Sequence, residues 1–268
     1  MSVPEQQMNA EQQTNAEQQT NAEQQTNAEQ RTNAEQRTNA EQQTNAEQQT
    51  NAEQQHAVLA DEVSPVTVRS SEVVYGGIVW DIRRDVFEYG DAKPVETITR
   101  EYVDHTGAVA VLALDEQDRV LLIRQYRHAI GAREWEIPAG LLDIDGEAPV
   151  LGAQRELAEE ADVVAGEWNL LSDFYSTPGG SNEAIRIYLA RGLSASGEIF
   201  ERTDEESEIE KRWVPLDEVV AAVLARTIGN SILSIAVLTA QVSRAGGWAS
   251  LGPADAPWPR HPKLRGRD

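Results

Sequence analysis

The order of hydrophobic and polar residues divides the chain into an amino-terminal part with no apolar pattern and a longer part with a clear one. Residues 8–55 are eight copies of a six-residue unit, Met/Thr-Asn-Ala-Glu-Gln-Gln/Arg. Successive alanines would lie about 120° apart around a helix, so they form no apolar stripe. We therefore predict that residues 1–57 are a disordered hexapeptide-repeat tail without a core. The repeat is interpreted as a tandem expansion without function or, alternatively, as a spacer or partner-binding arm.

From Ser71 onward, the apolar pattern changes to that of a folded α/β domain, which we predict over residues 71–245. Its first part, residues 71–104, is expected to form a small amino-terminal antiparallel sheet. The predicted strands of that sheet, with a bulge or bend at Gly76-Gly77, are 73–80, 84–89 and 95–103.

The core of the domain is predicted over residues 105–245. Its strand at 108–114 is apolar on both faces, so it should lie in the middle of a sheet, as the first strand of a hairpin with residues 120–126. The other predicted elements are a helix from Pro149 to about Ala161, strands at 168–175, 184–190 and 211–214, and helices at 216–226 and 231–243, the last capped by Asn230 or Ser231. Residues 246–268, rich in Pro, Gly and Arg, are interpreted as a carboxy-terminal tail.

The composition excludes several classes of protein. The net charge of −22 repels nucleic-acid backbones and anionic membranes, so neither is an expected partner. The absence of cysteine excludes disulfides, zinc thiolate sites and a thiol nucleophile. The longest apolar-rich run, residues 232–242, is too short to span a bilayer, and no signal peptide is recognisable. We therefore expect a cytoplasmic protein.

Three carboxylates crowd one face of the predicted helix at 149–161. Glu156 and Glu160 are four residues apart, and Glu159 is three residues after Glu156. Like charges at these spacings destabilise a helix, and no Lys or Arg at the following i+4 positions offsets them. A hard divalent cation would offset them, because Mg²⁺ takes oxygen ligands and shares phosphate oxygens with a substrate. The alternative interpretation is a solvated acidic face.

The surroundings of these carboxylates resemble the Nudix box. The matching residues are Gly140, Glu147, Arg155, Glu156, Leu157, Glu159, Glu160 and Val163, with the family's spacing of seven residues between Glu147 and Arg155. Two positions depart from the pattern. Six residues instead of five separate Gly140 from Glu147, and Asp162 stands where the box has a glycine in a left-handed conformation.

The resemblance implies a Nudix α/β/α sandwich with a mixed sheet, and an amino-terminal sheet that is exchanged between the subunits of a homodimer. It also implies that Mg²⁺, with Mn²⁺ as the alternative, is bound directly by Glu156 and Glu160. Glu159 would share a second ion, which gives it a catalytic role as well, and the carbonyl of Ala139 would be a further ligand. Glu147 and Arg155 resemble the pair that ties the loop to the helix.

The segment after the box resembles the ADP-ribose pyrophosphatase branch of this family, because Pro178 stands sixteen residues beyond Asp162. This implies hydrolysis of ADP-ribose to AMP and ribose 5-phosphate. Residues with chemistry suited to binding that substrate are Arg100, Arg127, Thr177 and Glu183. The alternatives are hydrolysis of another nucleoside diphosphate sugar, such as GDP-mannose, and a Nudix-derived module that binds ADP-ribose without cutting it.

The resemblance also implies a catalytic base on a loop outside the box. The acidic segment 200–210 is such a loop, and the matching position is Glu206, with Glu205 as the second candidate. The alternative is a solvated acidic loop. Candidates for stacking on adenine are Tyr75, Trp80 and Trp135, although aromatic residues more often belong to the core. The spacing of His105, His128 and His261 is not that of metal ligands.

Overall fold

The computed structural model describes residues 59–90, 95–197, 200 and 208–264. The whole predicted repeat tail, residues 1–57, and both candidate bases, Glu205 and Glu206, lie outside the described residues. Contacts divide the chain into two units, Met1–Val63 and Ser64–Asp268. The elements described below all belong to the second unit.

The amino-terminal sheet has three antiparallel strands, β1 (Val68–Tyr75), β2 (Asp81–Tyr89) and β3 (Glu96–Asp104), in the order β1-β2-β3. The predicted limits of the first strand, 73–80, are wrong, because β1 ends at Tyr75 and the two glycines belong to the turn that follows. A Cβ at Gly77 would lie 2.1 Å from the carbonyl oxygen of Trp80. The close approach of two backbone segments therefore requires this glycine in the turn.

The central sheet is mixed, as expected. Its five strands, in the order β11-β8-β9-β4-β7, are β11 (Gly252–Pro253), β8 (Val163–Tyr175), β9 (Ala184–Ala195), β4 (Ala108–Ala113) and β7 (Ala139–Leu141). Strand β4 pairs with β9 in parallel and with β7 in antiparallel orientation. All six residues of β4 are buried, which confirms its predicted central position.

A third sheet, in the order β10-β5-β6, contains β10 (Glu210–Pro215), β5 (Arg119–Arg127) and β6 (Ala132–Glu136), and the 3-10 helix η1 (His128–Ile130) joins β5 to β6. The predicted hairpin between β4 and β5 is therefore wrong. Only a single bridge, Leu114 to Val120, joins the two strands. Both edges of β4 are occupied by β7 and β9, so β5 pairs with β10 and β6 instead.

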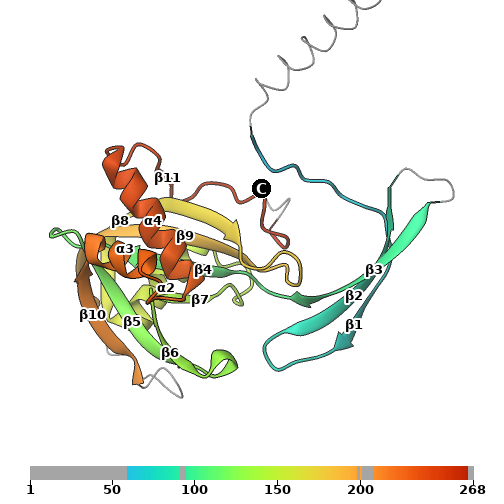
Figure 1. The fold of residues 1–268 in the computed structure, drawn as a ribbon, viewed down its shortest axis with the longest axis horizontal. Helices are drawn as coiled ribbons and strands as arrows, with labels where there is room; N and C mark the ends of the chain where they lie inside the picture. The colour runs from blue at the N-terminus through green and yellow to red at the C-terminus, as the bar shows by residue number, and fades with distance from the viewer. Residues whose placement is uncertain (1–58, 91–94, 198–199, 201–207, 265–268) are drawn as a thin grey trace, which may run out of the picture. The chain divides into compact units, whose positions relative to one another are not determined.

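Three helices cover the central sheet: α2 (Pro149–Ala161), α3 (Leu216–Leu224) and α4 (Ser231–Ala245) (Figure 1). The bounds of α2 are as predicted, and the Asn230 side chain caps α4 by accepting from the backbone N–H of Leu233 at 2.9 Å. In the part of the chain that the structure describes, no helix is both long and apolar enough to cross a membrane.

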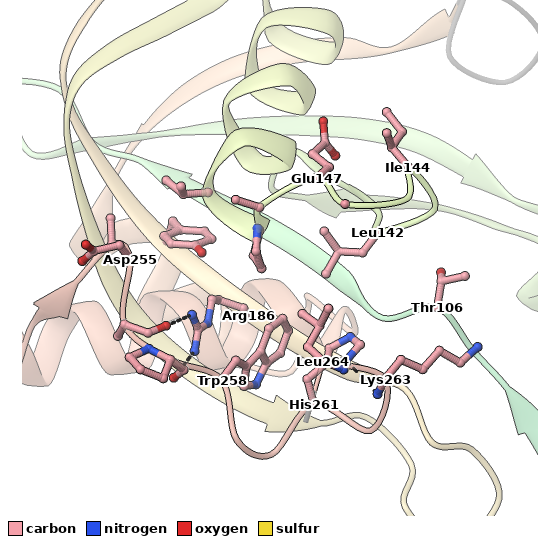
Figure 2. Close-up of a pocket in the computed structure, with 18 of the residues that line it drawn as sticks. Thr106, Leu142, Ile144, Glu147, Arg186, Asp255, Trp258, His261, Lys263 and Leu264 are labelled. Atoms are coloured by element: carbon pink, nitrogen blue, oxygen red, sulfur yellow. Dashed lines mark hydrogen bonds between the residues drawn. The ribbon is translucent and has the colours of Figure 1, made fainter. Parts of the chain in front are cut away.

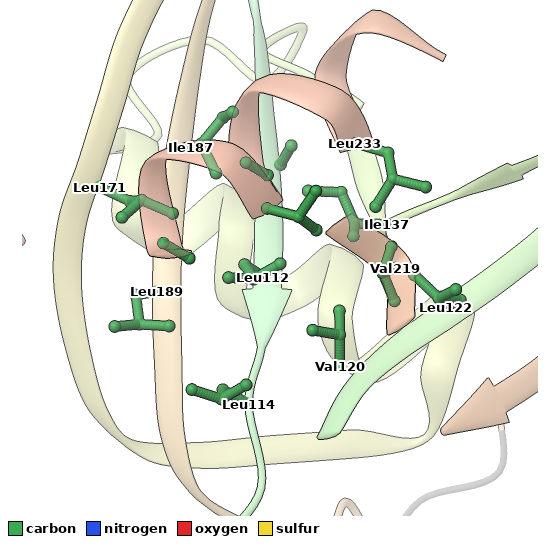
Figure 3. Packing of buried hydrophobic residues seen from close by; sticks show 14 of the residues in the cluster. Leu112, Leu114, Val120, Leu122, Ile137, Leu171, Ile187, Leu189, Val219 and Leu233 are labelled. Carbon is green, nitrogen blue, oxygen red and sulfur yellow. The ribbon is translucent and has the colours of Figure 1, made fainter. Parts of the chain in front are cut away.

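Alternate residues of β4 belong to two different hydrophobic clusters. Ala108, Ala110, Leu112 and Leu114 pack in a cluster with residues of α3 and α4 (Figure 3). Val109, Val111 and Ala113 pack with Ala153, Leu157 and Ala161 of α2. The period of two along a strand separates the two clusters, so helices cover both faces of the sheet. This is the expected α/β/α sandwich.

The segment after α4, expected to be a tail, packs on the core over its described residues. Fully buried Arg186 donates from Nη1 to the carbonyl of Ala256 at 2.7 Å, and its guanidinium lies 4.6 Å from the centre of the Trp258 ring (Figure 2). Trp258 is only 7% exposed. This segment closes one side of a cavity of about 830 Å³, whose other walls include residues 142–150.

Candidate active site

Arg155 is the centre of the charge network on α2. Its guanidinium lies 3.3 and 3.2 Å from the two oxygens of Glu147, 2.6 Å from Glu156 Oε1 and 3.1 Å from Glu159 Oε2. These carboxylates, with Glu147 the largest contributor, raise the pKa of Arg155. The crowded carboxylates on the helix are therefore offset by Arg155, which precedes them in the sequence, and not by a cation at a following i+4 position.

Two of the box glutamates, Glu156 and Glu160, face the strand that precedes the loop. Glu160, 5% exposed, accepts the backbone N–H of Ala139 through Oε2 at 2.9 Å. Glu156 packs directly on Gly140, where an added Cβ would lie 1.9 Å from the carboxyl carbon. A side chain at this position would displace the Glu156 carboxylate. The fold thus brings together Ala139, Glu156 and Glu160, all three of which are predicted metal ligands.

These residues have the donor chemistry of a divalent metal site. Within the described ranges, no three acidic or histidine side chains form a ready-made metal-binding group. Mg²⁺ does not require one, because it is commonly held by one or two carboxylates together with waters and substrate phosphates. Glu156, Glu160 and the Ala139 carbonyl satisfy that requirement. Glu159 is the more exposed of the box glutamates, and its contact is with Arg155.

Asp162 ends α2 in the left-handed conformation that the box glycine would have, with φ 60° and ψ 32°. Its carboxylate forms an ion pair with Lys211 of β10, and Lys211 Nζ also donates to the carbonyl of Ala161 at 3.2 Å. The negative charge at the carboxyl end of the helix is thus compensated by a cation from another strand. No local sequence pattern indicates that Lys211 is the partner of Asp162.

Arg127, predicted to bind phosphate, already has a partner on the neighbouring strand β6. Its Nε and Nη2 donate to the two oxygens of Glu136 at 2.8 and 2.7 Å. Glu136 is 4% exposed and also accepts from Gln125 at 3.4 Å. Sequence reasoning missed Glu136, although a charged residue in the apolar strand just before Ile137 and Pro138 was a usable signal. The Arg127 side chain remains about half exposed.

Arg100 lies on β3, where Nη1 donates to the carbonyl of Thr99 at 2.9 Å. Among the described residues, no hydrogen bond or ion pair joins it to the box. Of the aromatic candidates, Trp80 is stacked on His105 at 5.4 Å, and Trp135 lies under Arg124 at 5.5 Å. One chain therefore does not assemble all the predicted substrate-binding residues around α2.

The loop between β8 and β9, residues 176–183, is anchored to the end of β3. Its carbonyl oxygen at Thr177 accepts the N–H groups of Gly180 and Ser181, both at 3.0 Å, which closes a tight turn. Asn182 donates from Nδ2 to Asp104 at 2.9 Å and accepts the backbone N–H of His105 at 2.7 Å. Two predicted substrate-binding residues, Thr177 and Glu183, thus belong to one loop that is hydrogen-bonded to the end of β3.

Comparison with known proteins agrees with this architecture. Residues 104–232 match the model of the NUDIX domain. The chain is 40% identical to the ADP-ribose pyrophosphatase of Mycobacterium tuberculosis over 189 residues, which are 70% of this chain and 89% of that protein. It is 32% identical to the ADP-ribose pyrophosphatase of Bacillus subtilis over 176 residues, 66% of this chain and 92% of that protein.

A crystal structure of an ADP compounds hydrolase has the same fold, with a TM-score of 0.58 and 18% identity, over 70% of this chain and 98% of that one. The box geometry and these matches lead to one assignment. The chain belongs to the Nudix hydrolase family and resembles its ADP-ribose pyrophosphatase branch.

Proposed function

We propose that this Nudix hydrolase splits the pyrophosphate of ADP-ribose into AMP and ribose 5-phosphate. The observation that carries the proposal is the convergence of Glu156, Glu160 and Ala139 at Gly140, where a side chain would displace the Glu156 carboxylate. The names of the two bacterial relatives support the choice of substrate. Hydrolysis of another nucleoside diphosphate sugar is the alternative.

Divalent ions held by Glu156, Glu160 and the Ala139 carbonyl, with Glu159 sharing a second ion, would neutralise charge on the diphosphate and acidify the attacking water. The oxygen of that water forms a bond to one phosphorus while the bond from that phosphorus to the bridging oxygen breaks. The water's proton passes to a base, for which Glu206 and then Glu205 are proposed. Mg²⁺ is the proposed ion, and Mn²⁺ is the alternative.

The protein's own residues fix the reacting groups. Arg155 holds Glu147, Glu156 and Glu159 in one network, which keeps the carboxylates of α2 in place. Arg127 is held by Glu136 with part of its surface exposed, so it is oriented to meet a phosphate. Glu183 and Thr177 are proposed to contact the ribose and phosphate groups from the loop at 176–183.

We also propose a homodimer in which the partner covers the amino-terminal sheet. Every residue of β1 is exposed, including Val73 and Tyr75, and exposed apolar surface of this kind marks an interface. The partner would also bring Arg100 to the active site. Light scattering should give twice the chain mass, and Val73→Lys should lower that mass, whereas a monomeric wild-type protein would contradict the proposal.

The test of the function is a substrate panel. Purified protein is incubated with ADP-ribose, GDP-mannose and related diphosphates in Mg²⁺, in Mn²⁺ and in chelator, and chromatography identifies the products. Phosphatase-coupled release of phosphate gives the rates. Preferred conversion of ADP-ribose to AMP and ribose 5-phosphate is expected, with no turnover in chelator. Binding of ADP-ribose without turnover would instead identify a non-catalytic module.

A further inference from the structure

A buried histidine, His105, contacts the carboxylate of Glu183. Nε2 of His105 lies 3.3 Å from Glu183 Oε1, and the imidazole is 5% exposed. The two residues come from distant parts of the chain, His105 from the end of β3 and Glu183 from the residue before β9. Neither the composition nor the spacing of the histidines predicts this contact.

The hydrogen bonds of His105 fix which ring nitrogen carries the proton. Nδ1 accepts the backbone N–H of Gly107 at 3.0 Å, so it must be unprotonated. The remaining nitrogen, Nε2, then carries the hydrogen of the neutral ring, and it lies 3.3 Å from Glu183 Oε1. Burial lowers the pKa of His105, which favours the same neutral form. A neutral His105 therefore places an N–H group beside Glu183 Oε1 without adding a positive charge there.

The second oxygen of Glu183 is held as well. The hydroxyl of Ser176 donates to Glu183 Oε2, and the backbone N–H of Glu183 donates to the Ser181 hydroxyl at 3.1 Å. Oε2 thus has a hydrogen-bond donor and Oε1 lies against the imidazole of His105, while the side chain remains 24% exposed. A carboxylate oxygen accepts more than one hydrogen bond, so both oxygens keep capacity for a ligand.

We propose that His105 is a positioning residue that orients the Glu183 carboxylate to accept a hydroxyl of a substrate ribose. This inference rests on the proposed function, because it assigns a task to a residue of the same site. A carboxylate that is held before the ligand arrives loses little freedom on binding. The imidazole itself does not contact the substrate, and it acts only through Glu183.

The test measures steady-state kinetics of His105→Ala, His105→Gln, Glu183→Gln and the double variant His105→Ala/Glu183→Gln with ADP-ribose. His105→Ala should raise KM about tenfold with kcat within about threefold of wild type. Gln places an amide N–H near the position of Nε2, so His105→Gln should recover most of that loss. Because the two residues act as one unit, the double variant should be no worse than Glu183→Gln.

Two deoxy analogues of ADP-ribose, one for each ribose, give a second readout. Glu183→Gln identifies the contacted hydroxyl, since its KM effect should disappear on the analogue that lacks it. The effect of His105→Ala must disappear on the same analogue. A residue with only a structural role would change the melting temperature and the rates on both analogues alike.

Each outcome has a distinct meaning. If Glu183→Gln raises KM while His105→Ala does not, the positioning role is wrong and the proposed function stands. If Glu183→Gln leaves KM unchanged, the ribose contact and the positioning role both fail. No hydrolysis of ADP-ribose by wild-type protein would refute the function itself. Should His105→Ala fail to fold, Ser176→Ala removes the other donor without a large cavity, and a raised KM is again expected.

Discussion

Helix α2 and the loop at 176–183 hold their carboxylates in different ways. On α2, the partners of Arg155 are one, four and eight residues away in the sequence. Around the loop at 176–183, the hydrogen bond from His105 to Asn182 joins residues 77 apart, and that from Asn182 to Asp104 joins residues 78 apart. The first site is built by local geometry, and the second is built by the packing of β3 against the loop.

This difference decides what happens when a residue is changed. Local spacing keeps the box carboxylates on one helix face even when a neighbour is altered. Local spacing does not hold the side chains of the loop at 176–183 in place. Their contacts join residues far apart in the sequence, so they form only when the whole domain folds. Substitutions in the box should therefore reduce chemistry with little effect on folding, and substitutions near the loop should change binding.

The largest expected effect is that of Glu160→Gln. Gln can still accept the N–H of Ala139, and the loss of one charge relieves repulsion on α2, so the melting temperature should stay near wild type. Loss of this proposed metal ligand should lower kcat on the order of 1000-fold, ~4 kcal/mol of barrier. Glu116→Gln, at an exposed turn, is the matched control. Wild-type turnover by Glu160→Gln would show that Glu160 is not a required metal ligand.

The same difference explains how much the sequence could predict. The box residues, the bounds of α2 and the burial of β4 follow from local spacing and from the apolar pattern, and they were predictable. The partner of Arg127 on β6 and that of Asp162 on β10 depend on strand pairing, which no local pattern specifies. The hairpin prediction failed for that reason.

The carboxy-terminal segment was missed for a different reason. Its Pro and Gly content is typical of a tail. Composition does not show that a buried arginine donates hydrogen bonds to the backbone of this segment. Arg186 is neutralised by Asp173, with two contacts of 2.8 Å, and its remaining N–H groups bind the carbonyls of the segment. A charged residue inside the apolar strand β9 was the available signal that such a partner exists.

The second prediction tests the space that the box requires. Gly140→Ala would place a methyl group 1.9 Å from the carboxyl carbon of Glu156, so that carboxylate must move. We expect kcat to fall about 100-fold, with an overpacking cost of about 1–3 kcal/mol in the free energy of unfolding. Gly166→Ala on β8 is the control, because its nearest neighbour would be 3.7 Å away. Unchanged kcat in Gly140→Ala would show that the position of the Glu156 carboxylate does not matter for catalysis.

The third prediction separates two roles of Arg127. Arg127→Ala leaves buried Glu136 without its main partner, which should cost about 1–3 kcal/mol of stability, and it should raise KM about tenfold through the lost phosphate contact. Adding Glu136→Gln should restore most of the stability and leave KM high. Recovery of KM together with stability would show that Arg127 serves only to neutralise Glu136.

The smallest expected effect is at the end of α2. Asp162→Gly relieves the left-handed strain at φ 60° and removes an anion from the negative end of the helix dipole, each a gain of up to about 1 kcal/mol. It also breaks the exposed ion pair with Lys211, about 0.2–1 kcal/mol, and adds unfolded-state entropy of about 0.4–1 kcal/mol. These terms nearly cancel.

We therefore expect Asp162→Gly to change the free energy of unfolding by less than about 0.5 kcal/mol in urea denaturation. In a Lys211→Met background there is no ion pair to lose, so the same substitution should be clearly stabilising, and the difference between the two backgrounds measures the pair. Turnover should not fall, because the Asp162 carboxylate is held by a strand residue outside the box. An Asp162→Gly protein that folds normally but loses metal-dependent turnover would show instead that Asp162 has become part of the active site.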